Sequence, residues 1–227
     1  MFYDIFNLSY IDFEKAFDTI SHARLWEVLL EQGVDAGYIS ILKKLYHNQC
    51  ATVRVETVSR HFALHRGVKQ GDPLSALLFI AVMEACFRKL KKKWSTESRQ
   101  REGLPLGIQV ESAEATLRNL RFADDVILFA SCRDDIAQMI QDLADQAAVY
   151  GLNVNFSKTK VFANTVAGSM QQAVVVRGHS LPILPPSASE KYLGCCICLE
   201  NLYDKEVRCR ISSAWAGFMK FKAELCN

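Results

Sequence analysis

Two adjacent carboxylates, Asp124 and Asp125, stand between largely apolar, strand-forming residues 120–122 and 126–130. This pattern predicts a β-hairpin with the two aspartates at its tip. A desolvated carboxylate without a partner is strongly disfavoured, and a divalent metal ion is a common partner. Mg²⁺ prefers oxygen ligands and keeps positions open for water and substrate phosphates, so the pair predicts a metal site that needs a further carboxylate. The alternative is that Asp124 and Asp125 form only a polar turn.

The further carboxylate is Asp12, which follows the apolar residues 8–11. These residues predict a buried strand that runs into a turn, with Asp12 at its end. Carboxylates converge at strand ends in open sheets. The metal hypothesis therefore requires Asp12 to lie beside Asp124 in the fold.

A glycine-rich loop, residues 67–75, is the next stretch whose spacing suggests chemistry. Asp72 and Pro73 suit the N-cap and the first position of a helix. Gly67 and Gly71 flank Gln70, and glycines allow another backbone or a ligand to approach closely. A helix N-terminus also favours a phosphate or ribose group, although a well-capped helix after a loop explains the same residues.

The elements that must position these residues follow from apolar periodicity and from turn residues. The predicted helices cover residues 21–32, 36–47, 73–93, 134–150 and 204–225. The predicted strands cover residues 51–56, 60–64, 106–110, 116–121, 152–161 and 192–199, with an irregular hairpin over 173–186. We expect a polar loop over residues 94–103, disordered over 95–103.

Composition limits the classes of protein to which the chain can belong. Its 227 residues are 50% hydrophobic and 23% charged, as expected of one large globular domain or two small ones. A net charge of +2 permits an anionic partner without requiring one. The eight cysteines show no regular framework, which favours buried free thiols in a reducing compartment. No signal peptide or membrane span is evident, so we expect an intracellular protein, nuclear or cytoplasmic, with no membrane partner.

Five segments, taken together, resemble in order and spacing the polymerase motifs of reverse transcriptases, and most closely those of non-LTR, LINE-type retrotransposons. They are Tyr-Ile-Asp-Phe-Glu-Lys-Ala-Phe-Asp (10–18), Gly-Val-Lys-Gln-Gly-Asp-Pro-Leu-Ser (67–75), Phe-Ala-Asp-Asp (122–125), Gly-Leu-Asn-Val-Asn-Phe-Ser-Lys-Thr-Lys (151–160) and Tyr-Leu-Gly-Cys (192–195). The resemblance implies an α+β polymerase palm, an antiparallel sheet backed by helices, over residues 1–200. Residues 201–227 would be the first helix of a thumb. Fingers and the remaining thumb would come from adjoining segments of a retrotransposon polyprotein.

The resemblance also implies an RNA-directed DNA polymerase that adds dNTPs to a primer 3′-hydroxyl on an RNA template. Two Mg²⁺ ions, or Mn²⁺, would be held by Asp12, Asp124 and Asp125. Lys158 resembles the lysine that protonates the departing pyrophosphate, with Lys160 as the lesser candidate. The nucleotide would contact Phe13, Phe17, Gln70 and Gly71, with Phe17 excluding a ribose 2′-hydroxyl. The primer end, on a DNA primer, would be gripped by Tyr192, Leu193 and Gly194.

Other functions explain fewer of these residues. A truncated or domesticated palm, catalytically silent, would bind nucleic acid or a protein partner. A nucleotide cyclase on a related palm would explain the paired aspartates but not Gln70 and Gly71. Zinc binding by Cys195, Cys196 and Cys198 is disfavoured, because alternation on a strand separates their side chains.

Overall fold

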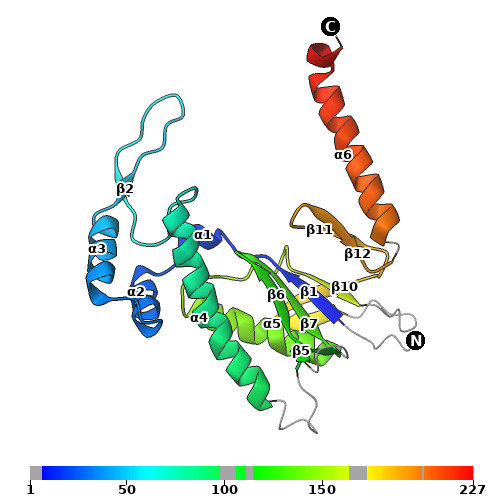
Figure 1. Cartoon of the computed structure of the whole chain (residues 1–227), viewed down its shortest axis with the longest axis horizontal. Helices are drawn as coiled ribbons and strands as arrows, with labels where there is room; N and C mark the ends of the chain where they lie inside the picture. Colours follow the sequence, from blue (N-terminus) through cyan, green and yellow to red (C-terminus); the bar gives the residue numbers. More distant parts are fainter. Residues whose placement is uncertain (1–6, 98–105, 111–114, 164–172, 201, 227) are drawn as a thin grey trace.

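The computed structural model describes residues 7–97, 106–110, 115–163, 173–200 and 202–226 (Figure 1). The helices are α1 (Ala16–Thr19), α2 (His22–Glu31), α3 (Ala36–Tyr46), α4 (Pro73–Glu97), α5 (Arg133–Ala148) and α6 (Leu202–Leu225). The strands are β1 (Asn7–Ile11), β2 (Cys50–Ala51), β3 (Phe62–Ala63), β4 (Ile108–Val110), β5 (Ala115–Leu117), β6 (Asn119–Phe122), β7 (Asp125–Ala130), β8 (Lys160–Ala163), β9 (Ala173–Val176), β10 (His179–Leu184), β11 (Ser189–Tyr192) and β12 (Cys195–Cys198).

A six-stranded sheet in the order β6-β7-β1-β8-β10-β9 forms the centre of the fold. Strand β1 lies between β7 and β8 and is antiparallel to both. The expected antiparallel sheet is therefore found, with one correction among the described strands: β10 runs parallel to β8. The parallel pair arises because β9 takes the outer edge and the chain returns through the β9–β10 hairpin into the place beside β8.

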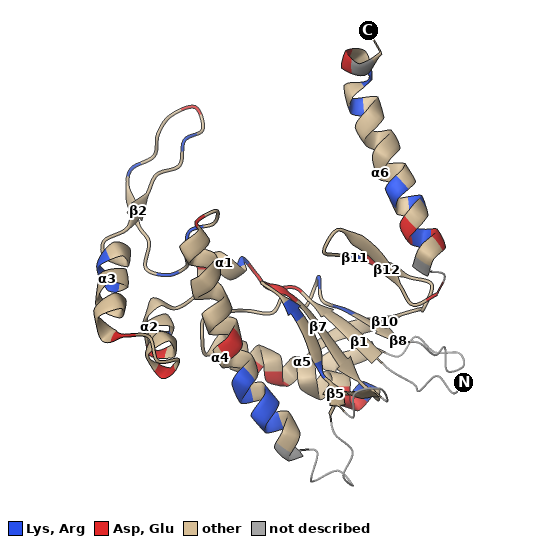
Figure 2. Ribbon diagram, in the orientation of Figure 1, with Lys and Arg blue, Asp and Glu red and all other residues tan. Residues whose placement is uncertain are grey.

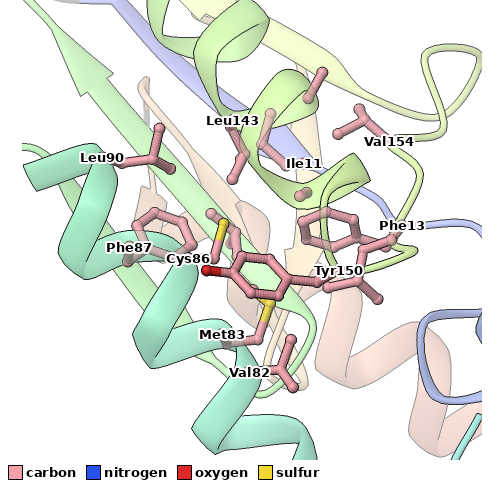
Figure 3. Close-up of a cluster of buried hydrophobic side chains, with 14 of the residues drawn as sticks. Ile11, Phe13, Val82, Met83, Cys86, Phe87, Leu90, Leu143, Tyr150 and Val154 are labelled. Atoms are coloured by element: carbon pink, nitrogen blue, oxygen red, sulfur yellow. The ribbon is translucent and has the colours of Figure 1, made fainter. Parts of the chain in front are cut away.

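Helices cover one face of this sheet. Helix α5 packs against β1, β7 and β9, and α4 packs against α5 and α2. The predicted apolar face of α5 is confirmed, since its members are fully buried: Ile136, Met139, Ile140, Leu143 and Ala147. Figure 3 shows Met83 and Cys86 of α4 extending toward Tyr150, at the end of α5, in the centre of this core.

The opposite face carries a smaller apolar cluster around Leu8, Ile127 and Phe162. The β11–β12 hairpin covers this cluster, and α6 projects away from the hairpin (Figure 1). The predicted strand over 192–199 is wrong in its first residues. Leu193 and Gly194 both have positive φ values, 50° and 80°, which is the signature of a two-residue type I′ turn.

The predicted loop over 94–103 is wrong over residues 94–97, which continue α4. Trp94 is fully buried, and its Nε1 donates a hydrogen bond of 2.9 Å to Asp142 Oδ2 on α5. Asp142, itself 2% exposed, also accepts hydrogen bonds from Lys93 (2.6 Å) and Gln138 (2.7 Å). This buried carboxylate therefore links α4 to α5. Residues 98–103 of the expected loop lie outside the described residues.

Smaller differences concern the surface. The predicted strands over 51–56 and 60–64 shrink to two residues each in an exposed hairpin, because their side chains find no core. Residues 152–159 form an isolated bridge at Val154 and a turn over 156–158, and the strand begins only at Lys160. All eight cysteines are free, but only Cys86, Cys196 and Cys198 are buried. None of the helices in the described ranges combines the length and the apolar character that crossing a bilayer requires.

Candidate active site

The pairing of β1 with β7 brings the three predicted aspartates together. Ile11 is the register partner of Val126, so Asp12 and Asp125, the next residues, lie side by side. Both line a cavity of about 320 Å³. Burial raises the pKa of the Asp125 carboxyl, and the charges of Asp124 and Asp12 raise it further. In Figure 2 the acidic tip of the β6–β7 hairpin lies beside the end of β1. Asp12 therefore lies beside Asp125, the residue that follows Asp124 in the sequence.

A two-residue turn holds Asp124 at the hairpin tip. Phe122 pairs with Asp125, so Ala123 and Asp124 form the turn. Ala123 has a φ of 53°, a left-handed conformation that costs an L-residue about 1 kcal/mol. The hairpin therefore presents its carboxylates through a strained backbone, as functional turns often do.

Backbone hydrogen bonds fix the segment that follows β1. Asn155 N donates to Asp12 O at 2.8 Å, and Glu14 N donates to the backbone oxygen of Asn153 at 2.9 Å. Phe13 forms a single bridge with Val154, and its side chain is 7% exposed within the core (Figure 3). Phe13, one of the residues assigned to the nucleotide, thus directs its ring into the core, and a ligand could contact only its backbone.

Two glycines hold the short helix α1 from either side. A Cβ on Gly67 would lie 2.6 Å from Asp18 O, and a Cβ on Gly151 would lie 2.5 Å from Thr19 O. Both glycines have positive φ values, +86° and +87°. The expected close approach is confirmed for Gly67, and the approaching group is the backbone of α1. At Gly71 a Cβ would meet nothing within 4 Å.

The remaining residues assigned to the nucleotide lie near α1 and outside the cavity. Phe17 is partly buried, and its ring stacks on Phe79 of α4 at 4.5 Å with an interplanar angle of 12°. Val68 N donates to Phe17 O at 2.6 Å, which joins the glycine-rich loop to α1. Gln70 and Gly71 follow on the exposed part of this loop, and Asp72 caps α4 as predicted, by accepting from Leu74 N at 3.0 Å.

The two candidate lysines have different surroundings. Both Lys158 and Lys160 line the cavity. Lys160 is ion-paired with Glu190 of β11. Lys158 is exposed, and its ammonium group forms no ion pair with any residue in the described part of the chain. Both ammonium groups thus belong to the cavity, that of Lys158 exposed and that of Lys160 paired with a carboxylate.

The β11–β12 hairpin brings Tyr192 to the same cavity. Its ring lies 5.9 Å from the ring of Tyr10, centroid to centroid. Burial raises the pKa of the Tyr192 hydroxyl, and the nearby charge of Asp125 raises it further. Leu193 and Gly194 form the exposed turn beyond Tyr192 and do not line the cavity.

Sequence reasoning missed Tyr10 and Glu190, which also line the cavity. Burial, followed by the charges of Glu190 and Tyr192, raises the pKa of Tyr10 to about 12. Tyr10 precedes Asp12 by two residues, so strand alternation places the two side chains on the same face of the sheet. The sequence alone could therefore have indicated Tyr10. Glu190 offered no comparable signal, because its partner lies 30 residues away in the chain.

The donor chemistry of the three aspartates fits a hard divalent cation. Carboxylate oxygens are the ligands that Mg²⁺ prefers, and a cation would offset the burial and the neighbouring negative charges that raise the pKa of Asp125. Within the described ranges no group of three or more acidic, histidine or cysteine side chains converges closely enough to hold an ion by itself. Water and substrate phosphates would have to complete the coordination, as is usual for Mg²⁺.

Comparison with known proteins agrees with the sequence and the geometry. Residues 7–197 match the family Reverse transcriptase (RNA-dependent DNA polymerase). The chain is 30% identical over 193 residues to the Retrovirus-related Pol polyprotein from type-2 retrotransposable element R2DM of Drosophila melanogaster, covering 81% of this chain and 17% of the relative. It is 28% identical over 196 residues to the Pol polyprotein from type-1 retrotransposable element R2 of Popillia japonica, covering 83% of this chain and 26% of the relative.

The fold is similar to that of a telomerase from Candida tropicalis, whose solved structure contains a fragment of telomeric RNA. The TM-score is 0.52 at 16% identity, over 88% of this chain and 29% of that chain. The chain thus spans about a quarter or less of the two retrotransposon polyproteins named above. Because the family match covers most of its length, this chain belongs to the reverse transcriptase (RNA-dependent DNA polymerase) family.

Proposed function

We propose that this chain is the catalytic palm of an RNA-directed DNA polymerase, which joins dNTPs to a primer 3′-hydroxyl. One observation supports the proposal: Asp12 and Asp125, more than 100 residues apart in sequence, lie side by side in one cavity that Tyr192 also lines. Nucleotidyl transfer needs such a convergence, because the attacking and leaving oxygens must be stabilised at the same point.

Asp12 and Asp124 would hold two Mg²⁺ or Mn²⁺ ions, with Asp125 supporting them. When bound, the ions would stabilise charge on the attacking and leaving oxygens. Lys158 would donate a proton to the departing pyrophosphate, because it faces the cavity and has no described ion-pair partner. Tyr192, with the Leu193–Gly194 turn, would hold the end of the DNA primer.

The dNTP would extend from the cavity toward α1 and the glycine-rich loop. Phe17 is held by its stack on Phe79, so its ring would present a fixed obstacle to a ribose 2′-hydroxyl. Gln70 and Gly71 are exposed and would contact the base or the RNA template, whereas Phe13 would act through its backbone. We propose that adjoining polyprotein segments supply fingers and thumb, and that the protein acts inside the cell, in nucleus or cytoplasm.

Primer extension tests this function. The chain, joined to the adjoining polyprotein segments that would supply fingers and thumb, is incubated with poly(rA)·oligo(dT), labelled dTTP and Mg²⁺ or Mn²⁺. We expect incorporation by the wild-type chain, complete loss in Asp124→Asn, and no change in Asp145→Asn, a control in which an exposed aspartate of α5 is neutralised. Binding of the duplex without incorporation would contradict the polymerase proposal and favour a silent binding module.

Metal binding gives a second, independent readout. Titration with Mn²⁺, followed by the electron paramagnetic resonance signal of the free ion, should show binding by the wild-type chain. The affinity should fall at least tenfold in Asp12→Asn, because removing one carboxylate removes a ligand and a charge. Equal affinities in the two proteins would argue against a metal site at Asp12.

A further inference from the structure

The β11–β12 hairpin is attached to the rest of the fold without a shared β-ladder. It forms a two-stranded sheet of its own, separate from the six-stranded sheet that carries Asp12 and Asp125. Among the described strands, β11 and β12 pair only with each other, from Ser189 with Cys198 to Tyr192 with Cys195. The placement of Tyr192 relative to the aspartates therefore depends on side-chain contacts.

Four side chains make these contacts beside the aspartates, and we call them the joint: Tyr10, Lys160, Glu190 and Tyr192. Tyr10 and Lys160 are register partners on β1 and β8. The Tyr10 ring lies 5.9 Å from the Tyr192 ring, and the Lys160 ammonium is ion-paired with Glu190. All four line the cavity that Asp12 and Asp125 line. The joint thus connects the hairpin to the two strands nearest the site.

Within the joint, Glu190 supplies the directional contact. Glu190 and Tyr192 are two residues apart on β11, so they lie on the same face of the strand. The ring contact between Tyr10 and Tyr192 is tilted at 57°, whereas the Lys160 ammonium donates a charge-assisted hydrogen bond to a carboxylate oxygen of Glu190. The charge of Glu190 is also the second-largest cause, after burial, of the raised pKa of Tyr10, which agrees with a carboxylate placed beside that ring.

We propose that Glu190 is a positioning residue, which holds Lys160 and thereby sets the hairpin that bears Tyr192 at a fixed distance from Asp12 and Asp125. The proposal rests on the function proposed above, since it assigns the hairpin to the primer end. The ion pair between Glu190 and Lys160 also bears on which lysine contacts the substrate. Lys160 is kept at the joint, which leaves Lys158 as the lysine that meets the triphosphate.

Hydrogen–deuterium exchange on the full chain tests the placement of the hairpin without any need for activity. Glu190→Gln keeps the size of the side chain and removes its charge. We expect about two- to fivefold faster exchange of the β11 and β12 amides, the range for one partly exposed ion pair, with no change in α5. The matched control is Glu200→Gln, which neutralises an exposed glutamate just after β12. Equal exchange in the two variants would overturn the proposal.

Binding of a fluorescent RNA·DNA duplex with a recessed primer end tests the consequence for the primer. Glu190→Gln and Lys160→Met should each raise the Kd for the duplex about two- to fivefold. The double variant should have a Kd no higher than that of the single variant that binds less tightly, because both substitutions break the same ion pair. Glu190→Asp should bind more tightly than Glu190→Gln, because it keeps the charge. Additive losses, or a Kd unchanged in Glu190→Gln, would refute the positioning role.

These measurements separate the two proposals. A wild-type chain that binds the duplex without incorporating dTTP contradicts the polymerase function, while the exchange and Kd results still decide whether Glu190 positions the hairpin. Where incorporation occurs, Glu190→Gln should raise the KM for primer–template about two- to fivefold and leave kcat unchanged at saturation. A loss confined to kcat would overturn the positioning role.

Discussion

The close contact between Gly151 and α1 gives a sharp test of how the site segment is held. Replacing Gly151 with alanine would place a Cβ 2.5 Å from Thr19 O and 3.1 Å from Ser21 N. Both atoms belong to the backbone, so a side-chain rotation cannot relieve the contact. The helix α1, and with it the segment that begins at Asp12, would have to move.

The magnitude follows from two contributions. A left-handed φ, here +87°, costs an alanine about 1 kcal/mol by itself. Forcing an added methyl group against packed backbone costs roughly 1–3 kcal/mol more. We therefore expect Gly151→Ala to lower the free energy of unfolding by about 2–4 kcal/mol. Gly178 provides the matched control, because its φ is +78° and a Cβ there would meet nothing within 4 Å.

Urea denaturation, followed by far-ultraviolet circular dichroism, measures both variants. Gly178→Ala should lose only about 1 kcal/mol, from its backbone conformation. If Gly151→Ala loses no more than Gly178→Ala, the contact with α1 is not tight, and the account of how the Asp12 segment is positioned is wrong.

Two further predictions concern buried polar groups. Asp142→Ala should lower the free energy of unfolding by about 3 kcal/mol in urea denaturation, because Trp94 and Gln138 lose their buried acceptor. Asp145→Asn, whose carboxylate is paired with an arginine at the exposed surface, should lose less than about 1 kcal/mol, and equal losses would contradict this reasoning. When the pH rises from 10 to 12, the free energy of unfolding should fall less in Tyr10→Phe than in the wild type. A folded-state pKa raised from 10.0 to about 12 keeps Tyr10 neutral while the unfolded chain ionises, so folding is disfavoured in that window. Denaturation at pH 8 and pH 11 checks this, and an identical decline in both proteins would refute it.

Local patterns in the sequence were enough to predict the five longer helices and the hairpin that carries the paired aspartates, but not the four-residue helix α1. The buried face of α5 follows a 3.6-residue period without interruption, and the caps at Asp72 and Gly151 mark helix ends by their backbone chemistry. The apolar residues on either side of the Asp124–Asp125 pair predicted the hairpin, in which Asp124 lies in the turn and Asp125 begins β7. In each case the information lies within about 15 residues.

Features that depend on distant partners were not predictable in the same way. Trp94 stands among polar residues, and its burial depends on partners elsewhere in the fold, among them the Asp142 carboxylate on α5 and the ring of Phe87. The turn at Leu193 and Gly194 was not predicted, because the apolar residues around it favour a continuous strand, although Gly194 is a residue type that favours turns. The pairing of Glu190 with Lys160 depends on how two sheets meet, which no sequence period encodes.

The central place of β1 has a consequence for biosynthesis. Its partners β7 and β8 are encoded far downstream, so β1 leaves the ribosome long before either neighbour exists. About 150 residues separate the end of β1 from the end of β8, which corresponds to roughly 8–30 s of translation. For that interval a strand that is largely buried in the final fold lacks both of its ladders, and unpaired strands of this kind are prone to aggregation.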